Sequence, residues 1–448
     1  MRRTYAGRRG SGRGAFIMRI DTTQTSTPST GTASSSTQFY FPIFDGQDRD
    51  GYTVNFTIDW GDGTTSDVNP TNFATACLHT YSVGGQYDVS AEGSVCGFNF
   101  WAMSQETGKA DSHKLLEIKQ WGDLMLTGGA GNSGSLYTRI GQVFRQCTNL
   151  TTVSASDFPI FPNDLNNNLN DYGARGLFSS CSSLVTINNI ANWQCQTLIR
   201  METMFNGCQK LQFGTNAGGG IDLTGWVAGR VTDFDRMFTN CSALGSGSGA
   251  KIFSDVGQKV TSGIITMSSM FSGCTNFNNN NAGTMNSWVM GRVTKTDFMF
   301  ADCPTFNDNI TSWDTGSITT MRGMFNDCTV FNQNIGSWNT GGVTDMRDMF
   351  TNCAAFDQDI SGWNVNAWSQ VGSGDTPISG PGTSLTLSTS NYDDLLVAWA
   401  AYSFPSWPGG TVDFGNSQYS LTSPGNVVIN ARNSLITTWG SINDGGGV

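Results

Sequence analysis

The stretch VTDMRDMFTNCAAFDQDISGWNVNA, residues 343–367, is the last of three consecutive copies of a 25-residue pattern. It follows ITTMRGMFNDCTVFNQNIGSWNTGG at 318–342 and VTKTDFMFADCPTFNDNITSWDTGS at 293–317. Each copy carries one Cys and one Trp at the same place. A unit of this length cannot bury its apolar face alone, so neighbouring copies must stack and share a core. The sequence therefore predicts a repeat array.

The centre of the pattern, F-x-x-C-x-x-[L/F], occurs eight times, with its cysteines at Cys147, Cys181, Cys208, Cys241, Cys274, Cys303, Cys328 and Cys353. The spacing is 27–34 residues in the early copies and 25 in the last ones, so we expect the extra residues to form loops. We expect the side chains at the Met, Phe, Cys and Leu or Phe positions to point into the core. We call this set of positions the inward ladder. We assign a leucine-rich-repeat-like solenoid of about eight coils to residues 106–370, with the repeat core at Phe300, Cys303, Phe325, Cys328, Phe350 and Cys353.

The composition is typical of a mainly β protein. Charged residues make up 13% of the chain and glycine contributes 55 of its 448 residues, a mixture that suits strands and turns better than long helices. Aromatic residues at 11% are enough to build a core. No run of about 18 apolar residues exists, so no membrane span is expected.

The N-terminus differs in charge from the rest. Residues 1–20 hold six Arg and no acid, which leaves about −17 on the other 428 residues of a chain whose net charge is −11. An acidic body argues against nucleic acid as the main partner, because phosphate binding needs clustered Lys and Arg. For the basic N-terminal residues, nucleic acid packaged in a particle is the weaker alternative as a binding partner.

Residues 1–15 are predicted to be a disordered basic arm. We expect its guanidinium groups to attach the protein to carboxylates of a capsid or neighbouring subunit, with Tyr5 and Phe16 as anchors. These arginines are Arg2, Arg3, Arg8, Arg9 and Arg13. The alternatives are a solvated tail, or a misassigned start codon with Met18 as the true start. On the first reading, a chain beginning at Met18 should fold normally and lose attachment. The arm does not have the apolar stretch of a secretory signal.

The cysteine count argues against a disulfide framework. There are eleven, an odd number, and eight occur once per repeat, so we interpret them as small buried apolar residues. Zinc binding is not expected, because there is no Cys-x-x-Cys and only His79 and His113 are available. Cys77 and Cys96 lie outside the repeats and could pair.

Residues 52–93 indicate a β domain before the array. Val54, Phe56 and Ile58 alternate with polar residues, as in a half-buried strand, and GDGT follows as a tight turn. W-G-D-G-T followed by H-T-Y and G-x-Y-x-V is similar to the PKD-type immunoglobulin-like fold. We therefore predict a β-sandwich over 16–105. Asp59 and Asp62 could be calcium ligands or catalytic acids, but turn formation is the preferred interpretation.

The repeat resembles that of the BspA-type leucine-rich-repeat surface proteins, V-T-x-M-x-x-M-F-x-x-[A/C]-x-x-F-N-x-D-I-x-x-W. The resemblance covers residues 140–367 and is most specific in the last three copies; residues 140–260 depart from it through insertions. It implies a cell-surface or virion-associated interaction protein without a catalytic residue.

After the array, the Gly, Pro and Ser content of residues 371–389 predicts a linker. Residues 390–448 should form a small helical cap, because Leu395, Leu396, Trp399 and Tyr402 follow helical spacing. A solenoid needs such a cap to cover its last coil.

No motif of an enzyme stands out, and we assign no catalytic, cofactor-binding or metal-binding residue. A carboxylate-only glycosidase would have to use residues such as Asp357 and Asp359, but these lie in a repeated turn where the preceding copy has Asn332 and Asn334. We expect a structural or interaction protein on a virion surface, as a capsid decoration, fibre or tail-associated protein; a bacterial cell-surface adhesin is the alternative. Its partners would be virion proteins, and a host-surface protein or a glycan. Self-association stays open.

Overall fold

The computed structural model describes residues 13–24, 31–43, 54–95, 97–124, 126, 141–159, 161, 174–195, 198–214, 221–223, 231–245, 265–278, 285–369, 378, 385–402 and 410–448. Strands outnumber helices in this part of the chain, which confirms the mainly β prediction. The chain divides into an N-terminal unit, residues 1–231, and a C-terminal unit, residues 232–448, and each is described here by itself. No helix in the described ranges has the length and apolarity needed to cross a membrane.

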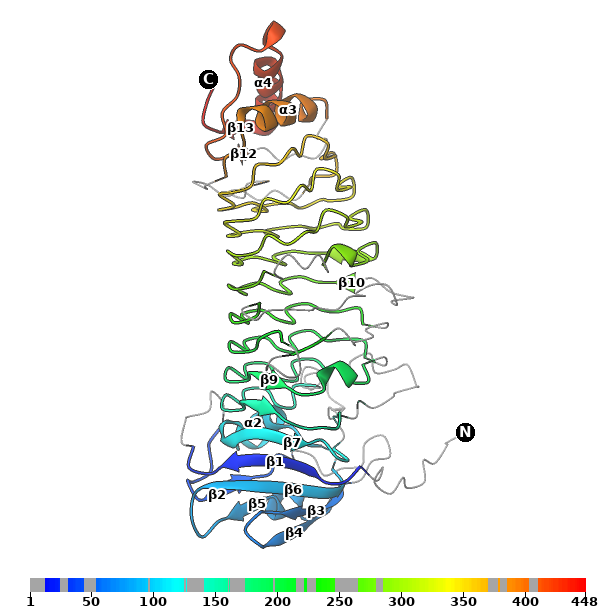
Figure 1. Cartoon of the computed structure of the whole chain (residues 1–448), viewed down its shortest axis with the longest axis vertical. Helices are drawn as coiled ribbons and strands as arrows, with labels where there is room; N and C mark the ends of the chain where they lie inside the picture. Colours follow the sequence, from blue (N-terminus) through cyan, green and yellow to red (C-terminus); the bar gives the residue numbers. More distant parts are fainter. Residues whose placement is uncertain are drawn as a thin grey trace, which may run out of the picture. The chain divides into compact units, whose positions relative to one another are not determined.

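The N-terminal unit is built on one sheet of seven strands in the order β4-β3-β6-β1-β7-β8-β9 (Figure 1). The first strand of the chain, β1, lies in the middle of this sheet and is antiparallel to both β6 and β7. From β7 onward the strands are parallel. The strands of this unit are β1 (Phe16–Asp21), β2 (Gln38–Tyr40), β3 (Asn55–Asp59), β4 (Thr65–Val68), β5 (Leu78–Thr80), β6 (Gln86–Ser94), β7 (Leu115–Gln120), β8 (Thr152–Val153) and β9 (Thr186–Ile187).

Short helices connect these strands: α1 (Phe73–Ala76), α2 (Phe100–Thr107) and the 3-10 turns Ser112–Lys114 and Ile190–Asn192. β2 and β5 form a separate antiparallel pair. The sheet crosses the boundary at residue 105 that the sequence predicts, because β7 lies beyond that boundary yet bonds to β1. Sequence spacing gives no sign of this long-range pairing.

The alternation of side chains in β1 corrects one expectation about the arm. Phe16, Met18 and Ile20 point into the core and are fully buried, as expected when successive side chains point to opposite faces. Phe16 is therefore an internal core residue and not an anchor for a partner. A chain that begins at Met18 would lose this residue and two pairs of the β1–β6 ladder, so we expect it to be less stable than the full chain.

In the C-terminal unit the repeats lie one above the other (Figure 1). We call each copy of the repeat a rung. The amide of Phe300 donates to the carbonyl of Met324 at 3.0 Å, and the amide of Phe325 donates to the carbonyl of Met349 at 3.0 Å. Parallel bridges join Thr320 to the rungs on both sides. Each rung thus satisfies backbone groups of its neighbour.

The apolar side chains of the rungs form continuous stacks. The rings of Phe300, Phe325 and Phe350 follow one another at 5.9 Å between centroids, and a second stack joins Phe331 and Phe356 at the same spacing. The six repeat-core residues named from the sequence all have no exposed surface. This burial supplies the main stabilisation of the unit, since the hydrophobic effect scales with apolar area removed from water.

The cysteines add a hydrogen bond to the packing. The thiol of Cys328 donates to the carbonyl of Phe300 at 3.0 Å, and that of Cys353 to the carbonyl of Phe325 at 2.8 Å. The N-terminal unit has the same contact from Cys181 to Phe144 at 3.1 Å. A thiol is a weak donor and small enough for this position. Burial raises the pKa of these thiols, and that of Cys77 to about 12.

The tryptophans of the rungs are packed in the core. Trp313 and Trp338 are stacked at 6.1 Å and almost fully buried. The indole N–H of Trp338 donates to the carbonyl of Ile310 at 3.3 Å, and that of Trp363 donates to Ile335 at 3.0 Å. A buried indole needs such a partner. These rings are not available to a ligand.

Two positions of each rung have left-handed backbone. The residue before the Cys has φ between 58° and 75° in all eight copies: Gln146, Ser180, Gly207, Asn240, Gly273, Asp302, Asp327 and Asn352. The residue four places earlier has φ between 54° and 59° in seven copies: Gly176, Thr203, Arg236, Ser269, Phe298, Gly323 and Asp348. Left-handed backbone is unfavourable for residues other than Gly, Asn and Asp, by roughly 1–2 kcal/mol per residue. The turns of the rung require it.

The C-terminal unit also contains β10 (Ile265–Thr266), β11 (Val293–Lys295), α3 (Thr389–Trp399), β12 (Gly410–Asp413), α4 (Val427–Trp439), β13 (Gly440–Asn443) and the 3-10 turns Met285–Ser287 and Pro424–Asn426. The helices α3 and α4 lie in the region where the sequence predicts a helical cap. Leu395, Leu396 and Trp399 of α3 are fully buried. Ile378 is the one described residue between 371 and 384, and its carbonyl accepts the amide of Phe350 at 2.8 Å.

Replacing Phe325 by Ala tests the aromatic stack. We expect the free energy of unfolding to fall by about 3–5 kcal/mol, because a fully buried ring leaves a cavity between two rungs. The control is Thr329→Ala on the same rung, where an exposed hydroxyl donates to Pro304 and its loss should cost about 1 kcal/mol or less. Urea denaturation followed by circular dichroism measures both. Equal, small losses would contradict the inward ladder.

Thiol reactivity tests the burial of the cysteines. The chain has eleven cysteines, and the ten that the structure describes are buried thiols. Only Cys96 lies outside the described residues. Because the thiolate is the reactive form and burial disfavours it, native protein at pH 8 should present at most one thiol to Ellman's reagent. Unfolding in urea should release the rest. Rapid reaction of several thiols in the native protein would contradict the burial of the cysteines.

Candidate functional site

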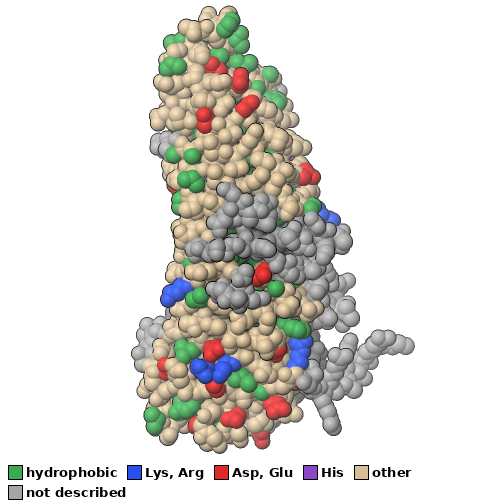
Figure 2. Space-filling model, viewed as in Figure 1, with side chains coloured by type: hydrophobic (Ala, Val, Ile, Leu, Met, Phe, Trp, Pro, Cys, Tyr) green, Lys and Arg blue, Asp and Glu red, His purple; other side chains and the backbone are tan. Residues whose placement is uncertain are grey.

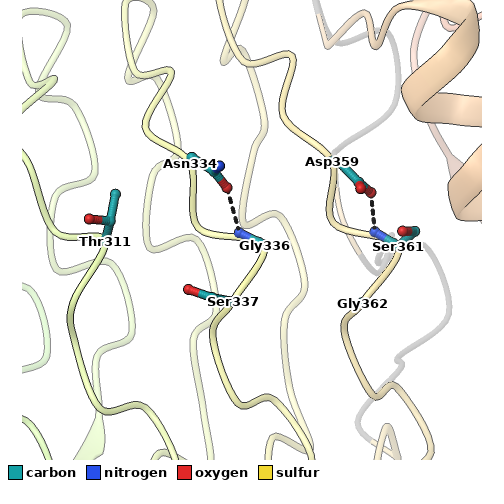
Figure 3. Close-up of a pocket in the computed structure, with 7 residues that line it drawn as sticks. All are labelled: Thr311, Asn334, Gly336, Ser337, Asp359, Ser361 and Gly362. Carbon is teal, nitrogen blue, oxygen red and sulfur yellow. Dashed lines mark hydrogen bonds between the residues drawn. The ribbon is translucent and has the colours of Figure 1, made fainter.

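A polar groove runs across the turns of three consecutive rungs in the C-terminal unit (Figure 3). It has a volume of about 610 Å³. Its lining consists of small or polar residues at matching positions of the rungs: Thr311, Asn334, Gly336, Ser337, Asp359, Ser361 and Gly362. None of the seven is a His, Lys, Arg, Cys or Tyr, so the groove offers hydrogen bonds but no acid–base pair.

The shape of the groove follows from a repeated turn. The side-chain oxygen of Asn334 accepts the amide of Gly336 at 3.2 Å, and that of Asp359 accepts the amide of Ser361 at 2.9 Å (Figure 3). Asn and Asp favour such turns because their short side chains reach the backbone two residues on. A Cβ at Gly336 would lie 2.3 Å from the carbonyl oxygen of Asp359, so this close approach requires glycine.

The two aspartates that a glycosidase would need have structural partners. Asp357 accepts the amide of Ser388 at 2.7 Å and the side-chain amide of Asn391 at 2.8 Å, which ties the last rung to the start of α3. Asp359 holds its own turn. Asn332 and Asn334 are at the equivalent positions of the preceding copy, and the structure shows the same kind of contact there: Asn332 accepts the amide of Asp357 at 3.0 Å.

Of the predicted attachment arginines, only Arg13 lies within the described residues; Arg2, Arg3, Arg8 and Arg9 lie outside them. The Arg13 guanidinium lies over the ring of Phe158 at 4.2 Å and donates to the carbonyl of the same residue at 3.1 Å. Arg13 therefore packs against its own chain.

Asp59 and Asp62 stabilise the turn in which they lie. Asp59 accepts the amide of Gly61 at 2.9 Å, and Asp62 accepts that of Thr64 at 3.0 Å. The ring of His79 contacts Asp62 at 2.7 Å. No group of three or more potential metal-ligating side chains occurs in the described part of the chain.

A charged cluster is buried beside the N-terminal sheet. The ammonium group of Lys114 is completely buried and donates to Ser34 Oγ at 2.7 Å and to the carbonyls of Ser35 and Gln38 at 2.8 Å. It also lies 3.5 Å from Asp111. Burial lowers the pKa of Lys114, although Asp111 opposes the shift. These contacts compensate the loss of hydration of the charges.

The surface over the N-terminal sheet carries paired charges. Asp88 binds Arg19 at 2.9 Å and Lys119 at 2.8 Å. Figure 2 shows basic and acidic side chains next to one another in this part, whereas much of the rest of the visible face is polar and uncharged. Arg19 and Lys119 are thus both neutralised by a neighbouring carboxylate.

Two stretches, residues 172–280 and 265–373, are similar to a family described as Mycoplasma protein of unknown function, DUF285. That family is associated with BspA-like surface repeat proteins. The two stretches overlap and together span less than half of the chain, so the similarity concerns the repeats alone. Comparison with curated proteins gave no match, and comparison with solved structures gave none either.

The buried His113 should make the N-terminal unit sensitive to acid. Its Nε2 lies 3.0 Å from the carbonyl of Gln24, and its Nδ1 is buried without a hydrogen-bond partner. Burial lowers the pKa of this imidazole, against the opposing effect of Asp111. The unfolded chain therefore binds a proton more readily than the folded one below about pH 6.5, and stability falls as the pH falls.

We expect the free energy of unfolding to decrease between about pH 6.5 and 5, by at most about 1.4 kcal/mol per pH unit for this one proton. A His113→Gln variant should lose this part of the slope even if its stability at pH 7.5 is lower. Urea denaturation of both proteins across this pH range measures the effect. The same slope in both would contradict the assignment to His113.

Proposed function

We propose that this chain is a non-enzymatic structural and interaction protein displayed on a virion surface, as a capsid decoration, a fibre or a tail-associated protein. The basic arm attaches it to a capsid or neighbouring virion protein. The array then presents its rungs to the outside, where a host-surface protein or glycan is the partner class.

The observation that carries the proposal is the use of polar groups within the array. Asp357, Asn332 and Asn334 hold turns or neighbouring rungs, and the buried thiols bond to backbone carbonyls. An array whose repeated polar residues serve its own geometry acts through its surface and not through a reaction centre. The similarity of the repeats to a family associated with surface repeat proteins points in the same direction.

We also propose a finer description of the two folds. The stacked rungs fit a BspA-type solenoid. The N-terminal sheet together with β2 and β5 fits a PKD-like sandwich, because the W-G-D-G-T turn is packed as a unit: Trp60 stacks on His79 at 4.8 Å, and the hydroxyl of Tyr81 donates to the carbonyl of Trp60 at 3.1 Å.

A bacterial cell-surface adhesin of the BspA type is the second candidate. The family similarity favours it, because that family is described from Mycoplasma. The two candidates share the exposed array and differ in what the N-terminal unit is attached to.

Particle composition tests the first candidate. Quantitative mass spectrometry of purified virions should find the protein, and replacement of Arg2, Arg3, Arg8 and Arg9 by Gln should strongly reduce its incorporation. These four residues lie outside β1 and outside the described residues, whereas truncation to Met18 removes part of β1. Arg19→Gln, which removes a basic residue from β1 and not from the arm, is the matched control and should incorporate normally.

Two outcomes would contradict this proposal at different points. Particles without the wild-type protein would overturn the virion location. Wild-type incorporation of the four-fold variant would overturn the attachment role of the arm.

A further inference from the structure

One aromatic residue of the array does not belong to its core. Of the aromatic residues that the structure describes between 265 and 368, all are buried except Phe298, which is partly exposed. It occupies the earlier of the two left-handed positions of its rung, with φ 55°. A bulky residue is rare in this conformation.

The stacking of the rungs does not require this ring. The same position holds Ser269 in the preceding rung, and Gly323 and Asp348 in the two that follow, with φ between 55° and 59°. These residues are smaller, and two of them are well suited to left-handed backbone. An aromatic side chain is thus present at a place where neither backbone geometry nor the core calls for one.

The ring is held in a defined place. It lies over the backbone of Gly323, where a Cβ would come within 2.4 Å of Phe298 Cε1. The guanidinium carbon of Arg322 is 5.7 Å from the ring centroid. Because Gly323 has no side chain, the ring fits closely against the backbone of the next rung.

Arg322, which lies beside the ring, contacts an acidic residue of each neighbouring rung. Asp297 accepts the amide of Arg322 at 3.0 Å and the hydroxyl of Thr320 at 2.7 Å, and Asp348 lies 3.7 Å from the Arg322 guanidinium. These contacts fix the position of Arg322 beside a partly exposed aromatic ring. Polar groups held in place around an apolar contact are typical of small-ligand sites.

We propose that Phe298, with Arg322 and the aspartates beside it, is a carbohydrate-binding point on the array. A pyranose ring has one apolar C–H face, which packs on an aromatic ring, and a rim of hydroxyl groups, which bond to carboxylates and guanidinium groups. A protein partner would need a wider apolar area, and here the neighbours of the ring are small or charged. This inference rests on the proposed function as a surface interaction protein and names a partner class for it.

The full-length chain should be tested on an array of defined neutral and acidic oligosaccharides, with titration of the one that gives the highest signal. We expect the wild type to bind, and Phe298→Gly to lower the affinity by about tenfold or more, the scale of losing one stacked ring. The melting temperature of Phe298→Gly should not fall, because glycine relieves the left-handed backbone. Phe298→Asn should lose binding in the same way.

Ser269→Gly is the matched control: it changes the same position of the neighbouring rung, without an aromatic ring, and should bind like the wild type. A wild-type chain that binds no oligosaccharide would overturn the inference, as would undiminished binding by Phe298→Gly. So would a lower melting temperature in Phe298→Gly that is absent in Ser269→Gly, because it would make the ring a packing residue. None of these outcomes depends on particle composition. The binding experiment and the test of the virion location can therefore fail independently of each other.

Discussion

The array depends on one contact that recurs from rung to rung: the carbonyl of the repeat Phe accepts the thiol of the next rung. The same carbonyl also accepts the amide of its own Cys, as between Phe325 and Cys328 at 3.0 Å. Two donors at one oxygen fix the register of adjacent rungs within a narrow range. The segment F-x-x-C-x-x-[L/F] therefore has a fixed length. The longer spacings of the early copies arise outside this segment. The constraint explains why a chain with irregular repeat lengths still keeps a continuous core.

Much of the core could be predicted from the sequence, because hydrophobic periodicity reports burial directly. Phe325, Cys328 and Trp338 are inside, as their repetition suggests. The left-handed positions were not predicted, although Asn, Asp or Gly before most of the repeat cysteines was an available signal. At Phe298 no such signal exists, since nothing in its residue type suggests left-handed backbone. The backbone of the neighbouring rungs imposes that conformation.

Pairings between distant segments lie further beyond sequence reasoning. The position of β1 between β6 and β7 depends on which strand edges remain open after the sheet forms, and no local pattern contains that information. The same holds for Asp357: its Asn equivalents suggest a turn, but its contact with Ser388 requires the cap to be in place. The polar groove follows from turns whose residues were noted in the sequence, yet their alignment across rungs is a property of the stack.

The central place of β1 has a mechanical meaning. The arm leads directly into this strand, and β1 is bonded on both sides, with six residue pairs to β6 and four to β7. A pull on the arm therefore acts along the strand, and the hydrogen bonds on both edges are loaded together in shear instead of opening one after another. A strand at the edge of the sheet would peel away under far less force. A particle tethered through this arm would be held by a strand that is bonded on both edges.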